Sequence, residues 1–333
     1  MWISRHRMMK HRELIDPAIL LYLVLRVIGL ALPEHSRARY NYIFKYIHYY
    51  KHIKTVLDTA LDRNSVLFAV VHLNAPDFLL LALESIRRLY PEKPLIVLDN
   101  GSHHFVLMKV TRMCKKYRCK LLYNASVYRD HVLAIQYLID YSSRLGKEFL
   151  VILDNDVTLV SRIDDVLALM RREKFVLAGP HDLIKLDEKY FRFAPLAVHA
   201  SMLILRPTEI IELAGRYCTF NYIIAKYSRT PEPYHSLAYA CLGRILYLKP
   251  VMLKELFPLT AYTFNNRVIA YHAWYSSRVR IHKDRLIDSL STEFLKRRHE
   301  QIKEFLIDKL KIMQSDLPRK HIMEYRRHQG FQT

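Results

Sequence analysis

Short apolar runs alternate with helical hydrophobic patterns from residue 66 onward. This alternation predicts a parallel sheet covered by helices, because strands buried on both faces are apolar along their whole length. The predicted strands are 66–71, 95–98, 120–123, 149–153, 175–178 and 197–205, and the predicted helices are 76–90, 105–117, 131–143 and 207–214. The fold class that follows is α/β, with a Rossmann-like, mostly parallel sheet flanked by helices.

Two extensions flank this domain, which spans residues 64–280. Apolar residues from Tyr40 to Leu61 recur at helical spacing, so residues 1–63 are predicted to form an all-helical N-terminal extension. Residues 281–333 form a basic C-terminal extension, and the pattern from Asp284 to Gln314 is typical of one long amphipathic helix.

An apolar run from Ala18 to Leu32 follows several basic residues near the start of the chain. It is short for a membrane span, and Arg26 lies in its middle. A helix packed on the protein's own core and a helix lying on a membrane surface both fit the pattern, and a cleaved or spanning segment fits it less well.

The chain carries 52 Lys and Arg against 32 Asp and Glu, which gives a formal charge of +20. This excess predicts an acidic partner, such as an anionic membrane surface. The basic residues are spread along the chain rather than gathered in one patch, which argues against nucleic acid as that partner.

Glycine and cysteine exclude several kinds of site. The 7 glycines are too widely spaced to build a glycine-rich phosphate-binding loop. The 4 cysteines include no C-x-x-C pair, so no zinc site is predicted. They are also too few for a disulfide scaffold in a chain of this length, which favours a reducing compartment.

Polar and acidic residues follow three of the predicted strands, at 72–74, 99–102 and 154–156. The carboxyl ends of parallel strands border the ligand site in an open sheet. Asp154 and Asp156 point to the same side of an extended chain, with their Cα atoms about 7 Å apart. Together they can hold one Mg²⁺ or Mn²⁺ along with phosphate oxygens. The alternative is a solvated surface loop, which the apolar strand just before the acids argues against.

Four segments, 70–79, 83–86, 96–102 and 153–157, resemble the family 2-like nucleotide-sugar glycosyltransferases of the GT-A fold. The likeness extends over residues 65–280 and implies a nucleotide-sugar half at 64–180 and an acceptor half at 181–280. The residues that it implies in donor binding are Asn74 at the nucleoside, Asp99 and its neighbour Asn100 at the base or ribose, and Asp154 and Asp156 at the metal-bound diphosphate. For Asp99, a turn-forming role ahead of Asn100 and Gly101 is the alternative.

The segment 271–278 resembles the loop that folds over the donor in many members of this family. The resemblance implies that His272 is a third metal ligand and that Arg278 neutralises the diphosphate leaving group. The alternative is a buried aromatic cluster with a hydrogen-bonded histidine.

Inverting transfer needs a general base beside the acceptor hydroxyl, and in this family an Asp or Glu of the second half supplies it. The usual Glu-Asp pair ahead of a helix has no clear match here. The candidates are Glu232, Asp182 and His235, and for Glu232 the alternative is a first-turn acid that only stabilises a helix.

The function implied is that of an inverting, hexosyltransferase-like enzyme that depends on Mn²⁺ or Mg²⁺. It would move a sugar from a nucleoside-diphosphate sugar to a glycan, lipid-linked or protein acceptor. The expected location is cytoplasmic and peripheral on the inner face of the membrane. The alternative is a non-catalytic membrane- or nucleic-acid-binding protein built on the same fold.

Overall fold

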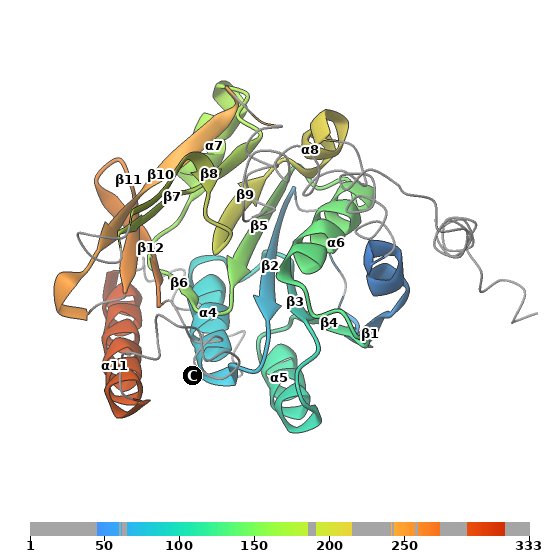
Figure 1. Cartoon of the computed structure of the whole chain (residues 1–333), viewed down its shortest axis with the longest axis horizontal. Helices are drawn as coiled ribbons and strands as arrows, with labels where there is room; N and C mark the ends of the chain where they lie inside the picture. Colours follow the sequence, from blue (N-terminus) through green and yellow to red (C-terminus); the bar gives the residue numbers. More distant parts are fainter. Residues whose placement is uncertain are drawn as a thin grey trace, which may run out of the picture.

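A computed structural model of the chain describes residues 45–59, 61, 65–185, 191–214, 241, 243–256, 259–273 and 292–316, and it has the predicted α/β architecture (Figure 1). The strands are β1 Ile53–Leu57, β2 Val66–His72, β3 Leu95–Asp99, β4 Lys120–Asn124, β5 Phe149–Asp154, β6 Val157–Leu159, β7 Leu177–Lys185, β8 Phe191–Val198, β9 Met202–Leu205, β10 Ile245–Met252, β11 Thr260–Phe264 and β12 Arg267–His272. The helices are α4 Pro76–Leu89, α5 His104–Lys116, α6 His131–Arg144, α7 Asp164–Arg172, α8 Pro207–Ala214, the short 3₁₀ helix η1 Lys254–Leu256 and α11 Thr292–Asp316.

The strands pair in the order β1-β4-β3-β2-β5-β9-β7-β10-β11-β12-β6. Pairing is parallel from β4 through β3 and β2 to β5, as expected for consecutive βαβ units. Beyond β5 the sheet is mixed, because β9 is antiparallel to both β5 and β7, whereas β10 is parallel to β7. The part of the sequence in which strands and helices alternate therefore forms the parallel part of the sheet.

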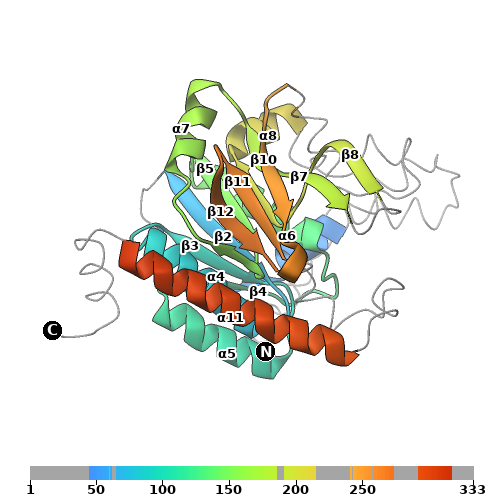
Figure 2. The same ribbon diagram turned by 90° about the vertical axis from the view of Figure 1, so that its left-hand side faces the viewer.

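Strand β2 lies in the middle of the parallel region and is buried along its whole length. Alternate side chains enter two separate cores: Phe68 joins the residues of α4 and α5, and Ala69 joins those of α6. Figure 2 shows α4, α5 and α11 together on one side of the sheet. Burial on both faces explains why β2 and its neighbours are apolar without alternation.

The expected all-helical N-terminal extension is wrong at its C-terminal end. Residues 45–51 are helical, but Ile53–Leu57 forms the edge strand β1, antiparallel to β4. The spacing of Ile53, Val56 and Leu57 fits a helix, but pairing with the free edge of β4 supplies backbone hydrogen bonds that outweigh this local preference. The apolar run at residues 18–32 lies outside the described residues.

The strand expected at 197–205 is interrupted. Both β8 and β9 run antiparallel to β7, and residues 199–201 break the strand between them. Gly179 of β7 lies against this break, where an added Cβ would meet Val198 at 2.3 Å and the carbonyl oxygen of Met202 at 2.6 Å. Only glycine leaves room for so close an approach of the two chains.

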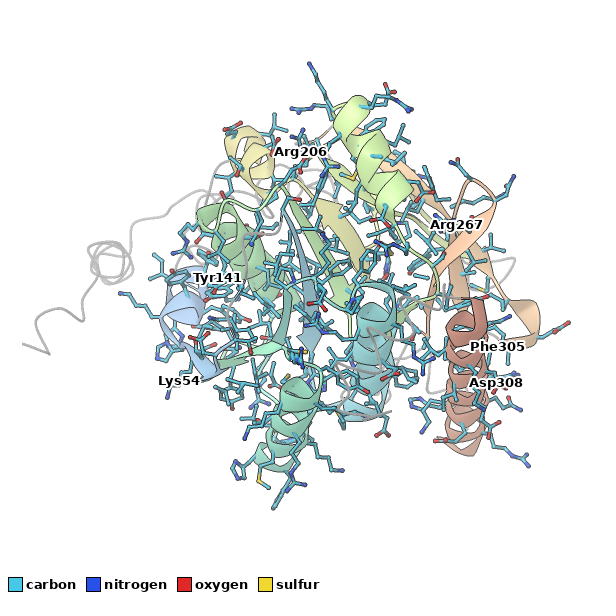
Figure 3. The ribbon with its side chains drawn as sticks, turned by 180° about the vertical axis from the view of Figure 1, so that it is seen from behind. Lys54, Tyr141, Arg206, Arg267, Phe305 and Asp308 are labelled. Carbon is cyan, nitrogen blue, oxygen red and sulfur yellow. The ribbon has the colours of Figure 1, made fainter. Side chains whose placement is uncertain are left out.

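The long C-terminal helix is observed as α11, although it begins at Thr292, and the residues just before it lie outside the described part. Its Ile302, Leu306 and Leu310 are buried in the core that α4 borders. Phe305, labelled on this helix in Figure 3, packs against Tyr271 of β12 with their ring centroids 5.2 Å apart. The described part of the C-terminal extension is thus packed on the domain.

Among the described residues, none of the helices combines the length and the apolar character needed to span a bilayer.

Candidate functional site

Asp154, Asp156 and His272 come together at the carboxyl end of β5. Asp154 ends β5, and a two-residue turn places Asp156 just before β6. Strand β12 pairs with β6 so that His272 lies opposite Val157, and the Ala273 N–H donates to the Asp156 carbonyl at 3.0 Å. This pairing brings His272 Nε2 to 3.4 Å from Asp156 Oδ1.

One oxygen of each acid and one imidazole nitrogen lie within 4.8 Å of one another. The side chains of Asp156 and His272 are 7% and 5% exposed, and that of Asp154 is 24% exposed. Two carboxylates so close together in a largely buried position repel each other unless a cation lies between them. Two carboxylate oxygens and one imidazole nitrogen fit Mn²⁺ or Mg²⁺, which also accept phosphate oxygens as ligands.

A chain of hydrogen bonds fixes the tautomer of His272. His199 Nδ1 accepts the backbone N–H of Ser201 at 3.2 Å, so it carries no proton, and Ser201 Oγ donates to it at 2.8 Å. The Tyr262 hydroxyl then donates to Ser201 Oγ at 2.7 Å, and His272 Nδ1 donates to the Tyr262 oxygen at 2.7 Å. This direction, assigned from the bonding pattern, places the His272 proton on Nδ1. The lone pair of Nε2 therefore faces Asp156, as metal binding requires.

His131 is a site residue that the sequence analysis missed. It is the first residue of α6, and its Nε2 lies 2.7 Å from Asp154 Oδ1. Burial alone lowers the pKa of His131, but the adjacent Asp154 carboxylate outweighs it and raises that pKa above the ordinary histidine value. The signal that could have found it is its place after β4, since helices that follow parallel strands begin at the same edge of the sheet as the acids.

Asp99 is fully buried, and its carboxylate is bonded inside its own turn. One oxygen accepts from His72 Nδ1 at 2.8 Å, and the other accepts the backbone N–H groups of Gly101 at 3.2 Å and Ser102 at 2.7 Å. His72 Nε2 accepts the Ala75 N–H at 3.1 Å, so the proton of this imidazole lies on Nδ1 and points at Asp99. These contacts are those of the turn-forming alternative.

Asn100 is also buried, at 2% exposure. Its side-chain oxygen accepts from the Tyr49 hydroxyl at 2.9 Å and from Asn124 Nδ2 at 3.0 Å. It thereby joins the helix at residues 45–51 to the ends of β3 and β4.

Asn74 lies half-buried in the loop between β2 and α4. The N-cap is Ala75, and Asn74 has a φ of 53°. In this left-handed conformation its side-chain oxygen accepts the His103 N–H at 3.0 Å, and its own N–H donates to Ser102 Oγ at 2.9 Å. Asn155 Nδ2 donates to the Ala75 carbonyl at 3.3 Å, which links this loop to the turn between the two acids.

The other predicted site residues lie outside the part of the chain that the structure describes. Glu232, His235 and Arg278 are among the residues not described. The backbone of Asp182 belongs to β7, but its side chain is not described.

No family model matches the chain, and a search of curated proteins found no match either. Among solved structures, the bifunctional glycosyltransferase WbbM matches over 59% of this chain and 40% of its own, with 12% identity and a TM-score of 0.40. TarS from S. aureus matches over 56% of this chain and 35% of its own, with 14% identity and a TM-score of 0.39. The mannosyltransferase PcManGT from Pyrobaculum calidifontis, in complex with GDP-Man and Mn²⁺, matches over 64% of this chain and 63% of its own, with 14% identity and a TM-score of 0.40.

The chain thus spans less than half the length of WbbM and TarS. WbbM is named as a glycosyltransferase and PcManGT as a mannosyltransferase, and each of the three solved structures matches only part of this chain. At such identities and TM-scores the likenesses do not assign an activity, which has to be inferred from the side chains of the site.

Proposed function

We propose that this chain is a metal-dependent glycosyltransferase that uses a nucleoside-diphosphate sugar as donor. The observation that carries the proposal is the convergence of Asp154, Asp156 and His272 at the carboxyl edge of a parallel sheet, with their ligand atoms within 4.8 Å of one another. This edge is where open α/β sheets bind ligands, and the sequence contains no glycine-rich phosphate-binding loop.

Asp154, Asp156 and His272 would hold Mn²⁺ or Mg²⁺, which when bound neutralises charge on the leaving diphosphate as a Lewis acid. His131 orients the Asp154 carboxylate through the contact at 2.7 Å. Tyr262 orients the His272 ring and keeps its proton on Nδ1. Asn74, with the turn of Asp99 and Asn100 behind it, would border the nucleoside, and Arg278 would add a positive charge at the diphosphate.

Transfer to a hydroxyl acceptor with inversion needs a general base. We retain Glu232, Asp182 and His235 as candidates for that role. The acceptor would be a glycan, a lipid-linked sugar or a protein, reached from the less regular half of the sheet. A cytoplasmic position on an anionic membrane surface is consistent with the charge of +20.

A thermal-shift panel of uridine, guanosine and thymidine diphosphates, each with and without Mn²⁺, tests the proposal. One nucleotide should raise the melting temperature of the full chain in the presence of Mn²⁺ and much less without it. If no nucleotide stabilises the chain in the presence of Mn²⁺, the donor site is wrong, and a non-catalytic binding protein built on the same fold becomes the better explanation.

A further inference from the structure

The outer face of α5 is basic, with two exposed apolar side chains at one end. Lys109, Arg112 and Lys116 lie four, seven and eleven residues after Phe105, and Met108 lies three residues after it, so the five side chains share one side of the helix. Phe105 is 78% exposed and Met108 is 42% exposed, and the three cations are also exposed. The sequence of α5 contains no Asp or Glu. We call this face the α5 surface.

The α5 surface is held rigidly by the rest of the domain. On the opposite side of the helix, Val110 and Cys114 are fully buried. At the C-terminal end, the buried guanidinium of Arg87 on α4 donates to the carbonyl oxygens of Tyr117 at 2.6 Å and Arg118 at 2.9 Å. The apolar and basic side chains are therefore presented together, without the ordering cost of a helix that folds on binding.

The apolar end of the α5 surface lies next to the candidate site. The His103 N–H, just before α5, donates to Asn74, and the neighbouring Ala75 carbonyl accepts from Asn155 between the two acids. Phe105 therefore lies at the end of α5 that is nearer the candidate site, and Lys116 lies at the other end.

We propose that the α5 surface docks on an anionic lipid bilayer, with Phe105 and Met108 in the headgroup region and Lys109, Arg112 and Lys116 on lipid phosphates. Exposed aromatic and aliphatic side chains beside lysine and arginine are typical of helices that lie in a membrane interface. A bilayer matches both parts of the surface, whereas a phosphate polymer matches only the cations. This inference extends the membrane part of the proposed function and supplies its contact surface.

Vesicle co-sedimentation of the full chain tests the proposal, with vesicles of phosphatidylcholine and phosphatidylglycerol and with vesicles of phosphatidylcholine alone. The triple variant Lys109→Glu, Arg112→Glu, Lys116→Glu should bind the anionic vesicles at least about tenfold more weakly than the unchanged chain. The matched control is Arg172→Glu, Lys249→Glu, Lys311→Glu, which changes the net charge equally at exposed positions on α7, β10 and α11. The affinity of the control variant for anionic vesicles should fall only a few-fold, because these residues lie outside the α5 surface.

A second variant tests the apolar contribution. Phe105→Trp should emit at shorter wavelength when anionic vesicles are added, because an indole that enters the interface leaves water. Phe105→Ser should weaken binding several-fold at unchanged net charge.

Equal losses in the two triple variants would overturn the proposal, because binding would then follow net charge alone. It would also fall if the α5 triple variant bound vesicles normally but lost affinity for RNA. Failure of the transferase proposal is separable, since Asp154→Asn with Asp156→Asn should bind vesicles like the unchanged chain, and the α5 variants should keep the Mn²⁺-dependent response to nucleotide.

Discussion

Two polar clusters lie at the carboxyl edge of the same sheet, and their side chains are engaged differently. In the first, at the ends of β2, β3 and β4, Asp99 accepts hydrogen bonds from His72 and two backbone N–H groups. In the second, at the end of β5, Asp154 and Asp156 lie beside each other and beside His272. We call these the turn cluster and the ligand cluster.

The comparison shows that a buried carboxylate does not by itself mark a ligand site. In the turn cluster, donors of this chain surround the acid, so its charge stabilises the loop. In the ligand cluster, two acids share one small space, so their repulsion is a cost that a divalent cation would remove. The four predictions that follow separate a structural acid from a ligand acid.

The largest effect is expected in the ligand cluster. Asp154→Asn with Asp156→Asn should reduce metal-dependent sugar transfer or donor hydrolysis on the order of a thousandfold or more, because both carboxylate ligands are lost. The melting temperature without metal should change little, since the repulsion between the acids and the attraction between Asp154 and His131 are lost together. Activity within a few-fold of the unchanged chain would show that these acids are not the metal site.

Removing the acid of the turn cluster should act on stability. Asp99→Ala leaves the buried Nδ1–H of His72 and two backbone N–H groups without their acceptor, and should lower the free energy of unfolding by about 3 kcal/mol. Denaturant titration measures this loss. The control is Asp308→Ala on α11, an exposed acid paired with Lys311, which should change stability by less than about 0.5 kcal/mol.

The folded fraction of Asp99→Ala should still bind Mn²⁺. Loss of Mn²⁺ binding at full stability would reverse the assignment of the two clusters.

Tyr262→Phe tests how the ligand cluster is oriented. Without the hydroxyl, nothing in the chain from His199 fixes the proton of His272 on Nδ1, so the affinity for Mn²⁺ should fall about 10- to 100-fold. Stability should fall by only about 1 kcal/mol. Tyr247→Phe, on β10, should leave the Mn²⁺ affinity unchanged. Equal affinities in the two variants would mean that the hydrogen-bond chain does not position His272.

The smallest effect concerns the turn cluster. Gly101 has a φ of 92°, so Gly101→Ala should cost about 1 to 2 kcal/mol of stability. Gly146→Ala is the control, because Gly146 has a φ of 65° and nothing within 4 Å of an added Cβ. The φ of Gly146 lies nearer the left-handed region that other residues adopt, so Gly146→Ala should lower stability less than Gly101→Ala. A larger loss for Gly146→Ala would show that the turn at Gly101 is not under the expected constraint.

The parallel half of the fold could be predicted from the sequence because each strand is a bounded apolar run. The prediction for β5, 149–153, differs from the observed strand Phe149–Asp154 by one residue. The hydrophobic pattern was sufficient there because a strand buried on both faces is apolar at every position, and such a run has clear ends. The same reasoning failed at Ile53–Leu57, where three residues in the middle of the strand are exposed and pairing with β4 decides the structure.

The candidate site could be predicted only in part, for a similar reason. Asp154 and Asp156 are only two residues apart in the sequence, so the short turn between β5 and β6 is enough to bring them together. His272 is far away in sequence, and it reaches Asp156 through the pairing of β12 with β6. That pairing has no local signature, so His272 was expected only from a resemblance. His131 and Tyr262 were missed because their partners also come from distant elements.

The most direct test of the ligand cluster is a titration of the full chain with Mn²⁺, followed by electron paramagnetic resonance of the free ion. The account predicts one saturable Mn²⁺ site per chain, bound more tightly when a nucleoside diphosphate is present and lost in Asp154→Asn with Asp156→Asn. Saturable binding that persists in this double variant, or no saturable binding by the unchanged chain with nucleotide present, would contradict it.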